Sequence, residues 1–378
     1  MTSVEVLPER WSSRAATVGL WGIGTAVPGS IAQLDAIPLA EALACRSDKE
    51  RSFLQRVFAR SGVESRGSVL VKEGGGIAEQ LRAFYRPRAD DSDRGPTTAE
   101  RMIVYAREAP VLAEQAARSA VENAGILPHD ITHIITVSCT GFVAPGLDVE
   151  MIQRIHLRPD VRRTHIGFMG CHAAFNALGA ARAIVAADPA AVVLVVCVEL
   201  SSLHFAYGFD PQKLVANALF ADGAAATIVG EAREDAPEWR LRITASQFLP
   251  DTLDAMTWRI GNHGFEMTLL PELPTIIRAN VRTWCDAWLS RAGTSLGDIK
   301  SWAVHPGGPK ILDAVAEALA LAPDALRFSR SVLAHHGNMS SATVLFILQE
   351  MARDNAPSPC LALGFGPGLM LEGMFLER

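Results

Sequence analysis

Residues 167–198 have the sequence GFMGCHAAFNALGAARAIVAADPAAVVLVVCV. The segment begins as a turn of small residues, continues as an Ala-rich run at 172–187 and ends in the apolar run VVLVVCV at 192–198. Alanine is a strong helix former whose small side chain allows close packing, so we expect 172–187 to be an interior helix. A short run of β-branched residues is typical of a strand buried on both faces. Together they predict an α/β protein.

The same alternation continues on both sides of this segment. TVGLWGIGTAVP (17–28) predicts an opening strand, 98–125 an amphipathic helix, HIITVS (133–138) a buried strand and ADGAAATIVG (221–230) another. Because strands and helices alternate, we expect α/β layers around a largely parallel sheet.

A polar stretch, Glu231 to Trp239, separates this part of the chain from a second one. Beyond it we expect helices at 272–291, 309–320 and 339–353, and strands at 301–305, 359–365 and 369–376. At roughly 100 to 200 residues per domain, the chain holds about two core units. The similar order of elements predicts two duplicated halves, 1–235 and 236–378.

The composition argues against several classes of protein. Hydrophobic residues make up 49%, charged residues 20%, and the net charge is -6 without a cluster of Lys and Arg, which disfavours a nucleic-acid surface. No run approaches ~20 apolar residues, so no membrane span is expected. The start MTSVEVLPERWSS does not resemble a secretory signal. Six widely spaced cysteines without a CxxC pair predict neither a disulfide framework nor a zinc site, and we expect a reduced, cytoplasmic protein.

Cys171 is the first candidate for chemistry. It lies where the small-residue turn meets the Ala-rich helix, and the positive helix end is expected to lower its pKa and favour the nucleophilic thiolate. The alternative is an inert cysteine that fills space before a buried helix.

Two further polar residues lie at comparable junctions. His305 ends the apolar strand SWAVH (301–305), at the edge where α/β proteins bind ligands, although a histidine that only bonds a turn remains an alternative. Asn338 precedes a helix and follows Gly337, and simple N-capping is its alternative. A thiol, an imidazole and an amide from three separate loops are together suited to thioester chemistry.

Five segments resemble the chalcone and stilbene synthase family, the type III polyketide synthases. They are GFMGC (167–171), ALFADGAAA (218–226), HPGGPKIL (305–312), GNMSSATVLFIL (337–348) and GFGPG (364–368). The similarity covers 130–378 closely and 17–70 more loosely. It implies a thiolase fold with five layers, α/β/α/β/α, and a homodimer.

The resemblance also implies a mechanism. Cys171 would take the starter acyl group from an acyl-CoA, with His305 pairing its thiolate, and His305 and Asn338 would bind the carbonyl of malonyl-CoA during decarboxylation. The expected reaction is iterative condensation that ends in a pyrone, resorcinol or related phenolic ring. CoA thioesters would be the substrates, without a metal or redox cofactor.

The resemblance assigns further residues to the walls of the cavity and its entrance. Phe220 matches a gatekeeping phenylalanine and Met267 replaces a second one. Trp258 replaces a glycine, and His204 and Cys139 replace threonines, so the pocket for a coumaroyl starter should be partly filled. Ala144 replaces a methionine that crosses the dimer interface. Ser340 is expected to contact substrate, and Arg56 and Arg60 to contact CoA phosphates, with solvated helix charges as the alternative.

Two other functions remain open on the sequence. A single-round ketoacyl synthase that uses an acyl carrier protein shares the Cys, His and Asn set, although GFGPG with HPGGP disfavours it. A catalytically inactive thiolase-fold binding protein is the third possibility, although all three reactive positions are intact.

Overall fold

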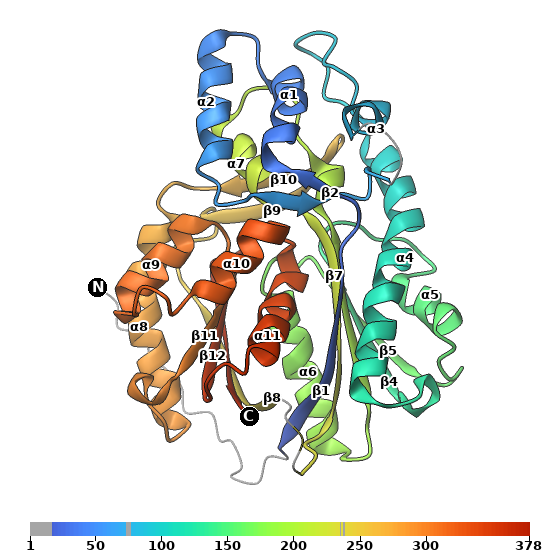
Figure 1. Cartoon of the computed structure of the whole chain (residues 1–378), viewed down its shortest axis with the longest axis vertical. Helices are drawn as coiled ribbons and strands as arrows, with labels where there is room; N and C mark the ends of the chain where they lie inside the picture. Colours follow the sequence, from blue (N-terminus) through green and yellow to red (C-terminus); the bar gives the residue numbers. More distant parts are fainter. Residues whose placement is uncertain (1–16, 73–76, 235, 237–238) are drawn as a thin grey trace.

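A mixed nine-stranded sheet forms the framework of the protein, in the order β11-β12-β13-β8-β1-β7-β6-β4-β5 (Figure 1). The structure is a computed structural model, and it describes residues 17–72, 77–234, 236 and 239–378. The start of the chain and residues 235 and 237–238 of the predicted junction lie outside the described residues. The strands are β1 (Val18–Ala26), β4 (His133–Ser138), β5 (Arg162–Gly167), β6 (Val193–Leu200), β7 (Asp222–Glu231), β8 (Trp239–Phe248), β11 (Ser301–Val304), β12 (Cys360–Gly366) and β13 (Met370–Glu377).

The two parts of this sheet and the helices packed against them form five layers. β1 and β8 pair only along Val18–Leu20, so the sheet consists of two parts that share a narrow seam. Between the parts lie α6 (Ala173–Ala187) and α11 (Thr343–Arg353) (Figure 1). Outside one part lie α4 (Thr98–Ala124) and α5 (Leu147–Arg154), and outside the other lie α8 (Leu273–Arg291) and α9 (Pro309–Leu319). The predicted α/β/α/β/α thiolase fold is confirmed.

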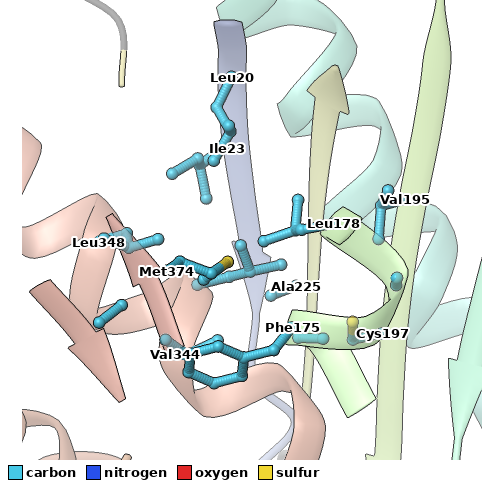
Figure 2. Packing of buried hydrophobic residues seen from close by; sticks show 14 of the residues in the cluster. Leu20, Ile23, Phe175, Leu178, Val195, Cys197, Ala225, Val344, Leu348 and Met374 are labelled. Carbon is cyan, nitrogen blue, oxygen red and sulfur yellow. The ribbon is translucent and has the colours of Figure 1, made fainter. Parts of the chain in front are cut away.

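Small residues allow the layers to approach one another. Alanines form half of the buried residues of α6, together with larger side chains such as Phe175 and Leu178. Figure 2 shows Phe175 next to Val344 of α11, in the same cluster as Leu178, Leu20 and Ile23 of β1 and Leu348 of α11. On the other side of β1, a Cβ on Gly22 or Gly24 would overlap the backbone of α4. The alanines of α6 and the glycines of β1 therefore set the spacing between layers.

The remaining elements cover the carboxyl ends of the strands. Two small two-stranded sheets, β2–β3 and the hairpin β9–β10, lie there with the helices α1, α2, α3 and α7, while α10 precedes α11 (Figure 1). Their bounds are α1 (Gln33–Ala44), α2 (Asp48–Ala59), α3 (Ile77–Phe84), α7 (Pro211–Leu219), α10 (Arg327–His336), β2 (Ser30–Ala32), β3 (Ser65–Gly67), β9 (Met256–Gly261) and β10 (Gly264–Leu269).

The expectation of a largely parallel sheet is wrong. β4 pairs in parallel with β5 and β6, and β11 with β12, but β1–β7, β6–β7, β12–β13 and β13–β8 are antiparallel. Adjacent strands such as β12 and β13 are joined by a tight turn without a helix, and a tight turn reverses the chain direction.

Candidate active site

Three loops bring Cys171, His305 and Asn338 to the wall of one cavity of about 480 Å³. Cys171 precedes α6, His305 follows β11 and Asn338 follows α10. All three side chains are buried, with His305 and Asn338 each only 1% exposed. The structure thus brings together residues that lie far apart in the sequence.

Glycines hold Cys171 in place. Gly170 has a φ of 82°, in the left-handed region, and a Cβ there would overlap Pro367 of the GFGPG segment. On β12, a Cβ on Gly364 would overlap Phe175, and one on Gly366 would overlap the ring of His172. The start of α6 therefore rests directly on the backbone of β12, and GFGPG supports the turn that carries the thiol.

His305 is fixed through its backbone and left unbonded at its ring. Its N–H donates to the carbonyl of Leu363 at 2.8 Å, which extends the pairing of β11 with β12 by one residue. Neither ring nitrogen has a hydrogen-bond partner among the described residues. A buried imidazole in this state is available to a substrate, because buried polar groups are otherwise almost always satisfied.

Asn338 does not cap a long helix. Its Oδ1 accepts a hydrogen bond from the N–H of Ser340 at 2.9 Å, while Nδ2 has no partner among the described residues. Its backbone is bonded to the chain on either side of Phe220, since its N–H donates to Leu219 and its carbonyl accepts from Ala221. Gly337, with a φ of 72°, permits this approach, because a Cβ there would crowd Ala221. The free amide group is left to face a ligand.

Burial dominates the electrostatics of the site. It raises the pKa of Cys171 to about 12, although the side chains of Ser340 and Asn338 act in the opposite direction. It lowers the pKa of His305 to about 3. The expectation that the helix end lowers the thiol pKa is therefore wrong as the net effect, because desolvation outweighs it. Because burial disfavours each charge on its own, a thiolate at Cys171 needs an opposite charge close to it.

An aromatic wall, made of His204, Trp258 and Phe265, lies beside the site. The rings of His204 and Phe265 stack at 4.2 Å, and the ring of Trp258 meets both edge-on. Trp258 Nε1 donates to the carbonyl of Cys139 at 2.7 Å, and the Sγ of Cys139 accepts from the N–H of Gly170 at 3.0 Å. The wall is thus bonded to the turn that carries Cys171.

His204 is fully hydrogen-bonded within this wall. Its Nδ1 accepts from the N–H of Phe265 at 2.9 Å, and its Nε2 donates to the carbonyl of Thr140 at 2.6 Å. Burial lowers its pKa to about 3. His204 is therefore a neutral, structural side chain that occupies volume.

Phe220 and Met267 separate the catalytic cavity from a second cavity of about 70 Å³, because they line both. His204, Trp258 and Phe265 line only the smaller one. The exposed Arg56 and Arg60 also line the larger cavity. The roles of these residues as a gate and as CoA contacts stay predictions.

Ser340 lies next to the site in a strained conformation. Its φ of 48° is in the left-handed region, which costs a residue with a Cβ about 1 to 3 kcal/mol. The hydrogen bond from its N–H to Asn338 helps to hold it there.

The sequence reasoning missed two residues of this region. Lys310, in the first turn of α9, lines the same cavity as Arg56 and Arg60, and the motif HPGGPKIL gives it no role of its own. Glu199 is fully buried behind Cys139, and its carboxylate accepts hydrogen bonds from the backbone N–H of Cys139 and from the hydroxyl groups of Thr140 and Ser341. Burial raises its pKa to about 7. A single acid at the end of VVLVVCVE was the available signal.

A five-layered fold with a buried cysteine, histidine and asparagine around one cavity defines a thiolase-fold enzyme. The N-terminal domain of chalcone and stilbene synthases matches residues 9–233, and the C-terminal domain of the same family matches residues 240–378. The chain belongs to the chalcone and stilbene synthase family and is a type III polyketide synthase.

Individual relatives agree with this assignment. The chain is 34% identical over 289 residues to the alpha-pyrone synthesis polyketide synthase-like Pks18 of Mycobacterium tuberculosis, covering 74% of each chain. It is 33% identical over 344 residues to type III polyketide synthase 21 of Oryza sativa subsp. japonica, covering 88% of this chain and 86% of the relative. The solved structure of PKS-I from the brown alga Ectocarpus siliculosus superposes with a TM-score of 0.88 at 29% identity, covering 97% of this chain and all of the other. No helix within the described ranges is long and apolar enough to cross a membrane.

Proposed function

We propose that Cys171, His305 and Asn338 catalyse the repeated decarboxylative condensation of malonyl-CoA onto an acyl-CoA starter. The observation that carries the proposal is their convergence on one buried cavity, with unbonded nitrogens on His305 and Asn338. The cavity lies between the proposed halves, 1–235 with Cys171 and 236–378 with the other two residues.

The first step loads the starter. The Cys171 thiolate attacks the acyl-CoA carbonyl, a new C–S bond forms and the bond to CoA breaks. The departing CoA thiolate takes the proton from the His305 imidazolium, so CoA leaves as a thiol and His305 becomes neutral. Burial supports this order, because it favours the neutral forms once the ion pair has been consumed.

The second step extends the chain. An N–H of neutral His305 and the Nδ2 group of Asn338 donate hydrogen bonds to the thioester carbonyl of malonyl-CoA. The carbon–carbon bond to the carboxylate breaks and carbon dioxide leaves. The electron pair of that bond stays on the remaining carbon and forms an enolate with the thioester carbonyl. The enolate carbon attacks the Cys171 thioester, the thiolate leaves, and the extended chain is now on CoA. A proton from solvent then recharges His305.

The entrance supports CoA thioesters as the substrates. Arg56, Arg60 and Lys310 surround an opening that leads to Cys171, and in a chain of net charge -6 they form a local cationic group for the CoA phosphates. The chemistry requires no other cofactor.

The aromatic wall supports a starter other than coumaroyl-CoA. His204 and Trp258 fill volume beside the site and are held by hydrogen bonds, so they cannot easily move aside. We propose a pyrone, resorcinol or related phenolic product, and the relative named for alpha-pyrone synthesis supports the pyrone.

A homodimer is also proposed. β5 is an edge strand, and the loop that includes Ala144 exposes Phe142 at 52% and Val143 at 42%, with Met169 at 40% in the next turn. Unpaired edges and exposed apolar groups favour association with a second copy.

Radiolabelled malonyl-CoA tests the proposed function. Incubation with short, long and aromatic acyl-CoA starters should yield labelled products from the unmodified enzyme and none from Cys171→Ala. Absence of both product and malonyl-CoA decarboxylation with every starter contradicts the proposal. A strict requirement for carrier-bound malonate would instead indicate the single-round ketoacyl synthase.

A further inference from the structure

His172 is a second buried imidazole that the reaction scheme leaves unused. It follows Cys171 directly, is 1% exposed and lies with its ring against the backbone of Gly366. Its Nε2 atom is buried and has no hydrogen-bond partner among the described residues. A histidine at this position needs an explanation, because an unpaired buried nitrogen costs about 1 to 3 kcal/mol.

A chain of polar groups fixes the orientation of His172. Its Nδ1 lies 2.8 Å from Oδ1 of Asn176, and Nδ2 of Asn176 donates to Oε1 of Glu372 at 3.1 Å. Ser246 donates to the other carboxylate oxygen of Glu372 at 2.6 Å. Because the Glu372 carboxylate can only accept, Asn176 must direct its NH₂ group towards it and its oxygen towards His172. The Nδ1 atom of His172 therefore carries the hydrogen, and Nε2 has only its lone pair.

His172 and His305 are both buried imidazoles, each 1% exposed. The proposed ion pair requires a proton on His305, and a charge on His172 opposes it, since that charge lowers the pKa of His305. Burial in turn lowers the pKa of His172 itself. The titratable groups around its ring are Cys171 before it, His305 from the loop after β11 and, beyond Asn176, Glu372 from β13. β12 contributes only the backbone of Gly366.

Asn176 is the residue that separates His172 from a full negative charge. A carboxylate bonded directly to Nδ1 would stabilise the imidazolium, as in catalytic His–Asp pairs, whereas a neutral amide does so much less. The chain instead places the carboxylate of Glu372 one side chain further away.

We propose that His172 is a positioning residue that stays neutral because it is buried and is bonded to the uncharged Asn176 in place of a carboxylate, which leaves the catalytic proton to His305 and so maintains the reactive thiolate of Cys171. The inference rests on the proposed roles of Cys171 and His305. It assigns to Asn176 a specific function, to insulate His172 from Glu372.

The substitution Asn176→Asp tests the inference, because it changes the charge and almost nothing of the shape. The rate of Cys171 alkylation by iodoacetamide is measured against pH on the full-length enzyme, with Cys171→Ala to subtract other thiols. We expect the rate at neutral pH to fall about tenfold, with the profile displaced to higher pH by about one unit. Asn123→Asp, on α4 away from the cavity, is the matched control and should leave the profile unchanged.

The double variant His172→Phe with Asn176→Asp separates the proposal from a direct effect of the new carboxylate on the thiol. If His172 transmits the effect, adding Asn176→Asp to His172→Phe should change the rate less than about twofold. A wild-type profile for Asn176→Asp, or an equal fall in both backgrounds, would overturn the inference.

The unmodified enzyme provides a test that does not depend on folding of a variant. In ¹⁵N-histidine NMR at neutral pH, the resonances that disappear in His172→Phe or His172→Gln should belong to a neutral ring with hydrogen on Nδ1. A cationic ring, or hydrogen on Nε2, contradicts the proposal.

Failure of the proposed function is seen separately, as absence of labelled product from the unmodified enzyme, while the alkylation profiles still decide the role of His172.

Discussion

Two buried histidines, His204 and His305, differ in whether their ring nitrogens are hydrogen-bonded. Burial lowers the pKa of each to about 3. Both nitrogens of His204 are hydrogen-bonded to backbone groups, whereas neither nitrogen of His305 has a partner among the described residues. The first ring completes the protein structure, and the second is kept available for a substrate. Unsatisfied hydrogen-bonding capacity, more than burial or pKa, distinguishes His305, which is proposed to be reactive, from the structural His204.

The largest effect is expected from His305→Ala. Loss of one donor to the developing enolate should lower the rate of product formation by about 10² to 10³. The free energy of unfolding should fall little, because no internal hydrogen bond of the ring is broken. Steady-state kinetics and urea unfolding measure the two effects, and a variant that is destabilised but fully active would reverse the comparison.

The opposite pattern is expected for His204→Ala. The substitution leaves the carbonyl of Thr140 and the N–H of Phe265 unpaired and opens a void against the ring of Phe265. The free energy of unfolding should decrease by about 3 kcal/mol, measured by urea denaturation. His129→Ala, at an exposed position, is the control and should change it by less than about 0.5 kcal/mol. Equal stability of both variants contradicts a structural role for His204.

Trp258→Gly examines the wall around His204. Removal of the indole opens volume beside Cys139, so bulky aromatic starters should gain about tenfold in kcat/KM relative to short aliphatic ones. Competition between two starters, followed by mass spectrometry, measures the ratio. Trp258→Phe keeps most of the volume and loses only the hydrogen bond to Cys139, so it should retain the original preference. An unchanged ratio in Trp258→Gly would place the starter elsewhere.

The smallest effect is expected at the exposed entrance. Arg56→Ala or Arg60→Ala should raise the KM for malonyl-CoA about threefold, and the difference should diminish with added salt, because exposed charges are screened. Arg158→Ala, whose side chain pairs with Asp160 at the surface, is the control. A KM that is unchanged in both entrance variants would leave these arginines as solvated helix charges.

Much of the architecture follows from the sequence, because small residues mark the points where layers meet. The Ala-rich run predicted α6, and Gly170, Gly364 and Gly366, from GFMGC and GFGPG, make the close contacts at the start of that helix. The half-exposed strands β5, β8, β9 and β10 were not predicted, because they lack a continuous apolar run.

The site was predicted less completely than the fold. Cys171, His305 and Asn338 lie at recognisable junctions between elements, and the structure brings them to one cavity. The sign of the Cys171 pKa shift depends on how deeply the thiol is buried, which local sequence does not reveal. The satisfied state of His204 likewise depends on partners 61 and 64 residues away.

The backbone bridge between Phe220 and Asn338 ties the partition of the cavity to a catalytic donor. Any insertion or hinge that widened the passage by moving this stretch of main chain would also displace the Asn338 amide, which is proposed to donate a hydrogen bond to the enolate. Enlargement is therefore compatible with turnover only by exchange of side chains, such as methionine at position 267. New products in this lineage should arise from point substitutions along the walls and seldom from changes in loop length.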